Sequence, residues 1–183
     1  MGVKWLLAAM VAVLFRPEAF WSDARERLRE VNAMKEYAAP LIAIAQFCKL
    51  PLFAVPRMAM LMAIIGFTVD VAALWLLSGA IAAVAGAKRA ETLQQEVMMV
   101  LCYSLTPLWF VEPFGIAGTW RWIVMAAALA YALFIARLGM LTMLGDEIPE
   151  IEPFFGKSAL LIATAAIISF LLQGGLLRFF TSF

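Results

Sequence analysis

Residues 58–87 read MAMLMAIIGFTVDVAALWLLSGAIAAVAGA, and these thirty residues contain a single ionisable side chain, that of Asp70. An apolar stretch of about 18 residues or more is typical of a helix that crosses a membrane. A charged group inside such a helix costs at least ~2.5–3.5 kcal/mol on insertion scales. The stretch therefore predicts a transmembrane helix in which Asp70 is paired with other polar groups, hydrated or used in function.

The rest of the chain repeats this apolar pattern. Hydrophobic residues make up 65% of the chain and charged residues only 15%, whereas an average soluble domain has roughly 25% charged residues. An embedded backbone must satisfy its own hydrogen bonds, so the apolar stretches are expected to be helices. We predict an all-α fold, a polytopic membrane bundle of five transmembrane helices in one domain, residues 38–183. Its spans are expected at about 38–54, 58–87, 96–111, 118–144 and 158–180.

Residues 1–37 are expected to form an N-terminal segment of interfacial and amphipathic helices on the cytoplasmic side. Residues 3–15 are apolar, but at 1.5 Å per residue they cover only about 20 Å of the ~30 Å hydrocarbon core. This length favours a helix in the membrane interface, with a short tilted span as the alternative. From Pro17 to Tyr37, apolar side chains recur every three or four residues, which predicts an amphipathic helix. The residues predicted to contact the membrane surface are Phe20, Trp21, Arg25 and Arg29, and a solvated surface helix is the alternative.

The basic residues predict an orientation. The arginines before the first span, Lys88 and Arg89 after the second, and Lys157 at the start of the fifth all fall on one side of the predicted bundle. Cytoplasmic loops carry an excess of lysine and arginine. We therefore expect an integral protein of the cytoplasmic (inner) membrane, with the N-terminus in the cytoplasm and the C-terminus outside.

Several classes of function are disfavoured by composition. The chain has no histidine, and Cys48 and Cys102 stand far apart in apolar surroundings, so no metal-site spacing or nucleophile–base pair is visible. A net charge of +1 argues against a nucleic-acid partner, which requires a basic face. We expect no catalytic residue, no enzyme activity and no cofactor.

Short motifs follow one another in a recognisable order. Residues 101–107 read LCYSLTP, a Tyr-Ser pair with a proline three residues after the serine, inside the third predicted span. PEAFW at residues 17–21, Lys88-Arg89, and Tyr131 followed by Gly139 and a polar loop complete the series. This series resembles the Ypt-interacting protein (Yip) domain family, prokaryotic type. The resemblance implies a five-helix membrane domain with a cytoplasmic N-terminus. Eukaryotic members of the family bind small GTPases in vesicle traffic. Resemblance to the prokaryotic type implies no settled biochemical activity.

Polar residues inside the spans predict one intramembrane cluster. Counted along the helices, Asp70 and Tyr131 lie at similar depth, with Tyr103, Ser104 and Gln173 somewhat shallower. We expect these five side chains to meet, with the Asp70 carboxyl accepting hydrogen bonds or protonated. Pro107 is expected to break the third helix nearby and free a carbonyl. The cluster is either polar glue between helices or a site for a proton, ion or solute.

An acidic loop precedes the last span. Asp146, Glu147, Glu150 and Glu152 are weak candidates for holding a hard cation such as calcium. The spacing and glycine of an EF-hand are missing, so a solvated loop, or one that faces the arginines of the N-terminal helix, is the preferred interpretation. No metal site is predicted.

These observations favour a Yip-like integral membrane protein that acts by binding, in membrane organisation or a trafficking-type role. Its expected partners are membrane lipids, copies of itself or other membrane proteins. The alternatives are a small transporter or channel that uses Asp70, and an accessory subunit of a larger membrane complex.

Overall fold

The computed structural model describes residues 3–50, 56–86, 90–114, 120–146, 148 and 150–181. These residues form helices joined by short connections, and no strand occurs among them. The prediction of an all-α fold is therefore confirmed. The helices are α1 (Val3–Phe15), α2 (Pro17–Glu30), the π-helix η1 (Met34–Ala38), α3 (Ala39–Cys48), α4 (Pro56–Val84), α5 (Ala90–Ser104), α6 (Thr106–Val111), the 3-10 helix η3 (Glu112–Phe114), α7 (Trp120–Leu144) and α8 (Ile151–Thr181).

Three of these helices are long and apolar enough to cross a membrane, at Arg57–Val84, Trp120–Leu144 and Ile151–Gln173. Their outward faces carry large apolar side chains that are more than half exposed, including Trp75 on α4 and Leu160 on α8. A soluble protein rarely leaves so much apolar surface uncovered. The exposure is therefore consistent with integration into a membrane.

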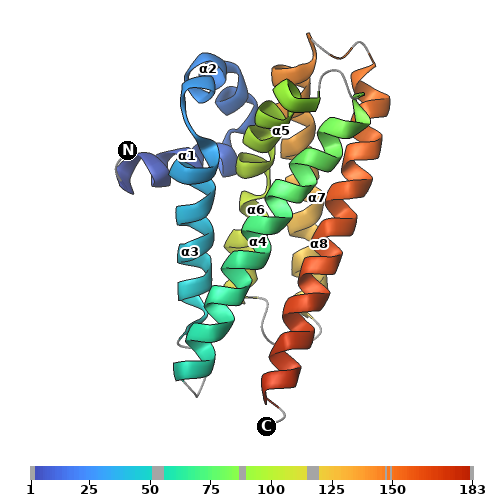
Figure 1. Cartoon of the computed structure of the whole chain (residues 1–183). Helices are drawn as coiled ribbons and strands as arrows, with labels where there is room; N and C mark the ends of the chain where they lie inside the picture. Colours follow the sequence, from blue (N-terminus) through green and yellow to red (C-terminus); the bar gives the residue numbers. More distant parts are fainter. Residues whose placement is uncertain are drawn as a thin grey trace.

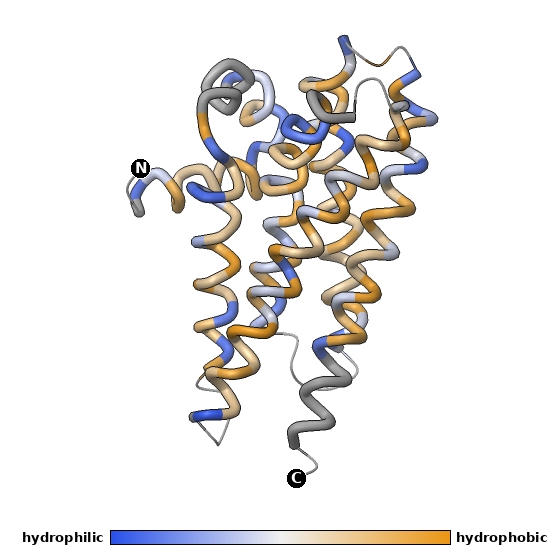
Figure 2. Tube along the Cα trace, viewed as in Figure 1, coloured by the Kyte–Doolittle hydropathy of each residue, from blue (hydrophilic) through white to orange (hydrophobic). Residues whose placement is uncertain are grey.

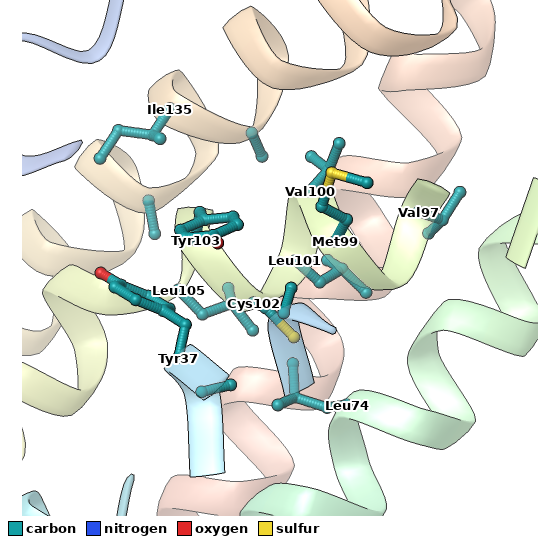
Figure 3. Packing of buried hydrophobic residues seen from close by; sticks show 14 of the residues in the cluster. Tyr37, Leu74, Val97, Met99, Val100, Leu101, Cys102, Tyr103, Leu105 and Ile135 are labelled. Atoms are coloured by element: carbon teal, nitrogen blue, oxygen red, sulfur yellow. The ribbon is translucent and has the colours of Figure 1, made fainter. Parts of the chain in front are cut away.

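The long helices pack side by side and α4 is central among them. It contacts α3, α5 and α8, while α7 contacts α5, α6, α8 and α2. In Figure 1, α4 crosses the bundle obliquely between α3 and α8. Tyr37 and Tyr103 lie inside the apolar core, fully buried, with ring centroids 4.4 Å apart. Figure 3 shows these two rings beside Leu105 and Cys102.

α1 and α2 lie at one end of the bundle, the end away from the C-terminus in Figure 1. α1 runs crosswise to α3 rather than parallel to it. Leu6, Ala9 and Val13 of α1 face the core and are buried, while Leu7 and Phe15 on the other side are exposed. Both faces of this helix are thus apolar, and only one of them is used in packing.

The aromatic face of α2 is directed at the protein. Trp21 is only 1% exposed, and an added Cβ at Gly139 of α7 would lie 2.7 Å from its ring. The predicted membrane-surface role of Trp21 is therefore wrong, because a glycine on α7 leaves room for the indole to pack inside the bundle. Phe20 is half-buried and packs against Trp21 and Tyr103. The side chains of Arg25 and Arg29 lie outside the described residues.

The helix that begins at Pro17 is also shorter than the predicted stretch, which ran to Tyr37. α2 ends at Glu30, and residues 31–33 separate it from η1, which leads into α3. Tyr37 is consequently a buried residue of η1, directly before α3. Apolar residues recur every three or four positions across this break because the segments before and after it pack against the same core.

The third predicted span is interrupted where Pro107 was expected to break it. α5 ends at Ser104 and α6 begins at Thr106, with Pro107 in its first turn. Pro107 has no N–H to bond to the Tyr103 carbonyl, four residues earlier. The Thr106 hydroxyl donates to that carbonyl instead, at 2.6 Å, and lies 2.8 Å from the Tyr37 hydroxyl. The freed carbonyl is thus satisfied locally.

Candidate functional site

A cavity of about 140 Å³ lies between α3, α4, α6, α7 and α8. Around the middle of α4 its lining is polar, and the members of this polar group are Gln46, Lys49, Asp70, Glu112, Ser169 and Gln173. Apolar residues line the cavity on both sides of this group, at Ala59, Met62 and Ala63 of α4 and, towards the α2 end of the bundle, at Ala73, Leu74, Leu77, Leu105, Ile162 and Ala165. Figure 2 shows hydrophilic positions on α3 and α4 within helices that are otherwise hydrophobic. The cavity is therefore amphipathic.

Asp70 is the central residue of α4, fourteen residues from Pro56 and fourteen from Val84, or about 21 Å from either end. It is only 8% exposed. Its Oδ2 accepts a hydrogen bond from Gln46 Nε2 at 3.0 Å. Its Oδ1 accepts from Ser169 Oγ at 3.3 Å and from Gln173 Nε2 at 3.2 Å. All the donors that the described part of the chain offers to this carboxyl are neutral.

Lys49 supplies a cation to the same group. Its Nζ forms a salt bridge with Glu112, which follows α6 directly. It also donates to Gln46 Oε1 at 2.9 Å and to Gln173 Oε1 at 3.3 Å. The Lys49 and Glu112 side chains are 12% and 15% exposed. Both side chains are thus more exposed than Asp70 and Gln46.

Helical spacing explains why these side chains meet. Gln46 and Lys49 are three residues apart at the end of α3, and Ser169 and Gln173 are four apart on α8. Such pairs share one face of a helix. Gly66 lies one turn before Asp70, and a Cβ there would approach Gln46 Oε1 to 2.5 Å. The glycine therefore leaves room for the Gln46 amide to lie against α4.

Aromatic and basic side chains complete the wall of the cavity. Trp109 of α6 and Phe170 of α8 both line it. The guanidinium of Arg121 lies 3.8 Å from the centroid of the Phe170 ring, a distance typical of a cation–π contact. Trp122 packs edge-on against the same ring, with centroids 4.8 Å apart.

The structure brings together two members of the predicted intramembrane cluster, Asp70 and Gln173. It does not bring Tyr103, Ser104 or Tyr131 to them. Tyr103 is buried in the aromatic core beside Tyr37 and Trp21, and neither its hydroxyl nor that of Ser104 has a hydrogen-bond partner among the described residues. These three assignments to the cluster are therefore wrong.

Tyr131 serves a different contact. Its hydroxyl donates to the Leu14 carbonyl at 2.6 Å, close to the end of α1. The last carbonyls of a helix have no partner within it, so this bond caps α1 and ties it to α7. Depth along a helix, which was the basis of the prediction, does not determine the face on which a side chain lies.

Gln46, Lys49, Glu112 and Ser169 were not predicted to join Asp70. Two signals pointed to them. Polar residues recur at helical spacing within apolar helices, at Gln46–Lys49 and at Ser169–Gln173. Glu112 directly follows the third predicted span, on the same side of the bundle as Lys49.

The described residues of the acidic loop do not come together as a metal-binding group. Among the residues that the structure describes, no group of three or more His, Cys, Asp or Glu side chains could hold a metal ion. Glu152 forms an exposed ion pair with Arg137. Glu150 and Asp146 are exposed, and Glu147 lies outside the described residues.

Comparison with known proteins gave no relative. No family model, no curated protein and no solved structure matched this chain.

Proposed function

We propose that this chain is a membrane-integrated binding protein whose ligand is a small amphiphile, a lipid-type molecule held in the cavity around Asp70. The observation that carries this proposal is that one cavity is lined both by a polar group around Asp70 and by apolar side chains. Ligand sites are typically apolar hollows with a few placed polar groups that set orientation. A head group would lie near Asp70, and the apolar remainder would lie against Leu74, Leu77 and Ile162.

The size of the cavity limits the part of a ligand that it encloses. Its volume of about 140 Å³ is close to that of an engineered apolar cavity of about 150 Å³ that binds benzene. A head group with a ring, or with a few methylenes, would fit inside. A longer tail would have to leave between the helices towards the lipid.

The placement in the membrane is part of the proposal. We infer five crossings, formed by α3, α4, α5 with α6, α7 and α8, because α3 and the α5–α6 pair pack alongside the three long helices. We place the N-terminus in the cytoplasm and the C-terminus outside, in the inner membrane, on the charge distribution. The crosswise direction of α1 supports an interfacial position rather than a sixth crossing. Membership of the Yip family remains a prediction.

A second function, transport of a proton or solute, is favoured by one observation. Lys49 and Glu112, which are partly exposed, are linked through Gln46 and Gln173 to Asp70 at the middle of α4. Polar chains of this kind inside a membrane mark ion and proton paths. A transporter would show flux in liposomes that Asp70→Asn abolishes, whereas a binding protein would show none.

Native mass spectrometry of the protein in a mild detergent tests the binding function. The unaltered protein should retain an amphiphile. Ala73→Phe places a ring into the cavity, whereas Ala72→Phe places the same ring on the exposed face one residue earlier. Ala73→Phe should lose the bound molecule and Ala72→Phe should keep it. Equal retention by both variants would exclude the cavity as the binding site.

If Ala73→Phe does not fold, Ala73→Leu is the smaller change at the same position. Circular dichroism of each variant shows whether the helices are intact. A folded Ala73→Leu protein that keeps the full complement of amphiphile would count against the proposal in the same way.

A further inference from the structure

The charges around the cavity point to the chemical class of the ligand's head group, an inference that rests on the proposed function. Four ionisable side chains line the cavity, Asp70, Glu112, Lys49 and Arg121. The Lys49 ammonium is already in a salt bridge with Glu112. The Arg121 guanidinium lies over the Phe170 ring. Asp70 forms a direct ion pair with neither cation: its hydrogen bonds among the described residues come from amide and hydroxyl groups, and the Lys49 ammonium reaches it only through the amides of Gln46 and Gln173.

Neutral donors compensate a buried carboxylate only in part. Gln46, Ser169 and Gln173 each donate one hydrogen bond to Asp70. A buried charge without a direct ion pair remains costly in a medium of low dielectric. A cation that reached Asp70 from the cavity would remove this cost and form a charge-assisted hydrogen bond.

We propose that the cavity binds an amphiphilic amine whose ammonium group donates to the Asp70 carboxylate. The hydrocarbon or ring part of the amine extends to the apolar wall at Leu74, Leu77 and Ile162. Trp109 lies in the same wall and supplies an aromatic surface that attracts cations.

An anionic head group fits this site less well. The Lys49 ammonium is engaged by Glu112 and by the oxygens of Gln46 and Gln173. An anion placed among the polar residues would lie close to both Asp70 and Glu112, and like charges at short range repel. The order of affinity expected from the charges is therefore amine, then neutral alcohol, then carboxylate.

Three ligands that share one ring test this order. Benzylamine, benzyl alcohol and benzoate differ mainly in the charge of the head group at pH 7. Isothermal titration calorimetry of the full chain in a mild detergent, with detergent alone as the blank, gives the affinity for each. Benzylamine should bind tighter than benzyl alcohol by about tenfold or more, since charge-assisted hydrogen bonds are about twice as strong as neutral ones. Benzoate should bind weakest.

Asp70→Asn removes the charge and keeps nearly the same shape. In this variant, benzylamine should lose its advantage over benzyl alcohol while the alcohol binds as before. Thr68→Val is the matched control, because Thr68 is exposed on the same helix and its hydroxyl donates to the Ile64 carbonyl, one turn earlier in that helix. This control should leave all three affinities unchanged.

The outcomes separate the two proposals. Equal binding of amine and alcohol by the unaltered protein would overturn the amine inference and leave the amphiphile site standing. Tighter binding of benzoate would overturn it as well. No binding of any of the three would count against both proposals. The comparison of the three ligands on the unaltered protein does not depend on whether Asp70→Asn folds.

Discussion

Lys49 and Asp70 are joined through two glutamine amides. Gln46 and Gln173 each accept a hydrogen bond from the Lys49 ammonium through Oε1. Each also donates to the Asp70 carboxylate through Nε2. The four side chains form a closed ring across α3, α4 and α8. An amide bridges a cation and an anion well because its oxygen and its nitrogen carry opposite partial charges.

Gly66→Ala should weaken this ring. The new Cβ would displace the Gln46 amide, since it would lie 2.5 Å from Oε1, and Asp70 would lose a donor. Loss of a partner to a buried polar group costs about 1–3 kcal/mol, which exceeds the gain of up to about 1 kcal/mol from replacing a helical glycine. Thermal unfolding followed by circular dichroism should show a lower Tm.

Gly79→Ala is the matched control for Gly66→Ala. Gly79 lies on the same helix as Gly66, and its Cβ would meet Gln94 of α5 at 3.5 Å, an ordinary contact. The Tm of this variant should be unchanged or slightly raised. If both glycine variants gain stability equally, the position of Gln46 against Gly66 does not matter to the fold.

Lys49→Met should cost more stability than the double change Lys49→Met with Glu112→Gln. The single change leaves Glu112 without its cation, and breaking a buried ion pair in this way costs about 3–5 kcal/mol. The cost should fall at the low end because both side chains are slightly exposed. The free energies of unfolding of the two single variants and the double variant form a cycle. If the changes in free energy of unfolding of the two single variants add up to that of the double variant, Lys49 and Glu112 do not interact.

Gly139→Ala should loosen α2 from the bundle. Its Cβ would lie 2.7 and 2.9 Å from the Trp21 ring and 3.0 Å from Val100. Such overpacking costs about 1–3 kcal/mol. Gly156→Ala is the control, because a Cβ there meets nothing within 4 Å. The Tm should fall for Gly139→Ala only, and equal values for both variants would contradict the close packing of Trp21.

Tyr131→Phe should release the end of α1. The variant loses the hydrogen bond to the Leu14 carbonyl, a contribution of about 0.5–1.5 kcal/mol. Hydrogen exchange over residues 3–15 should become faster while exchange in α7 stays the same. Unchanged exchange in α1 would show that its packing alone holds it.

Two buried tyrosines should respond in opposite ways to loss of the hydroxyl. The Tyr37 hydroxyl bonds to Thr106 at 2.8 Å, so Tyr37→Phe should lower the Tm. The Tyr103 hydroxyl is buried without a partner among the described residues, so Tyr103→Phe should leave the Tm unchanged or raise it. The two rings are in contact and differ mainly in this bond, which makes each variant a control for the other.

The positions of the helices could be predicted well because they depend on local runs of apolar residues in the sequence. The stretch predicted at residues 118–144 is α7 at Trp120–Leu144, and the stretch predicted at 58–87 is α4 at Pro56–Val84. Apolar runs bounded by prolines and charges determine such segments. α5 begins at Ala90 and α8 at Ile151, earlier than predicted, because polar residues such as Glu152 and Lys157 continue a helix once packing has formed it.

The candidate site was predictable only in part. Asp70 was found because it is the one charge in its apolar run. Gln173 was found because it is polar and deep in the last run. Tyr103 and Tyr131 were placed with them on depth alone, although Tyr103 turns into the aromatic core and Tyr131 towards α1. The rotation of each helix about its axis depends on contacts with its neighbours.

The sequence alone determined that this chain is helical, that its long apolar runs can span a membrane and that an acid lies at the middle of one of them. Runs of apolar side chains and single charges are local properties, so each can be recognised within one continuous stretch of the sequence. Only the tertiary structure decided which groups surround that acid. Gln46, Asp70, Glu112 and Gln173 come from four separate segments, and their meeting depends on how glycines and small side chains allow those helices to approach and turn.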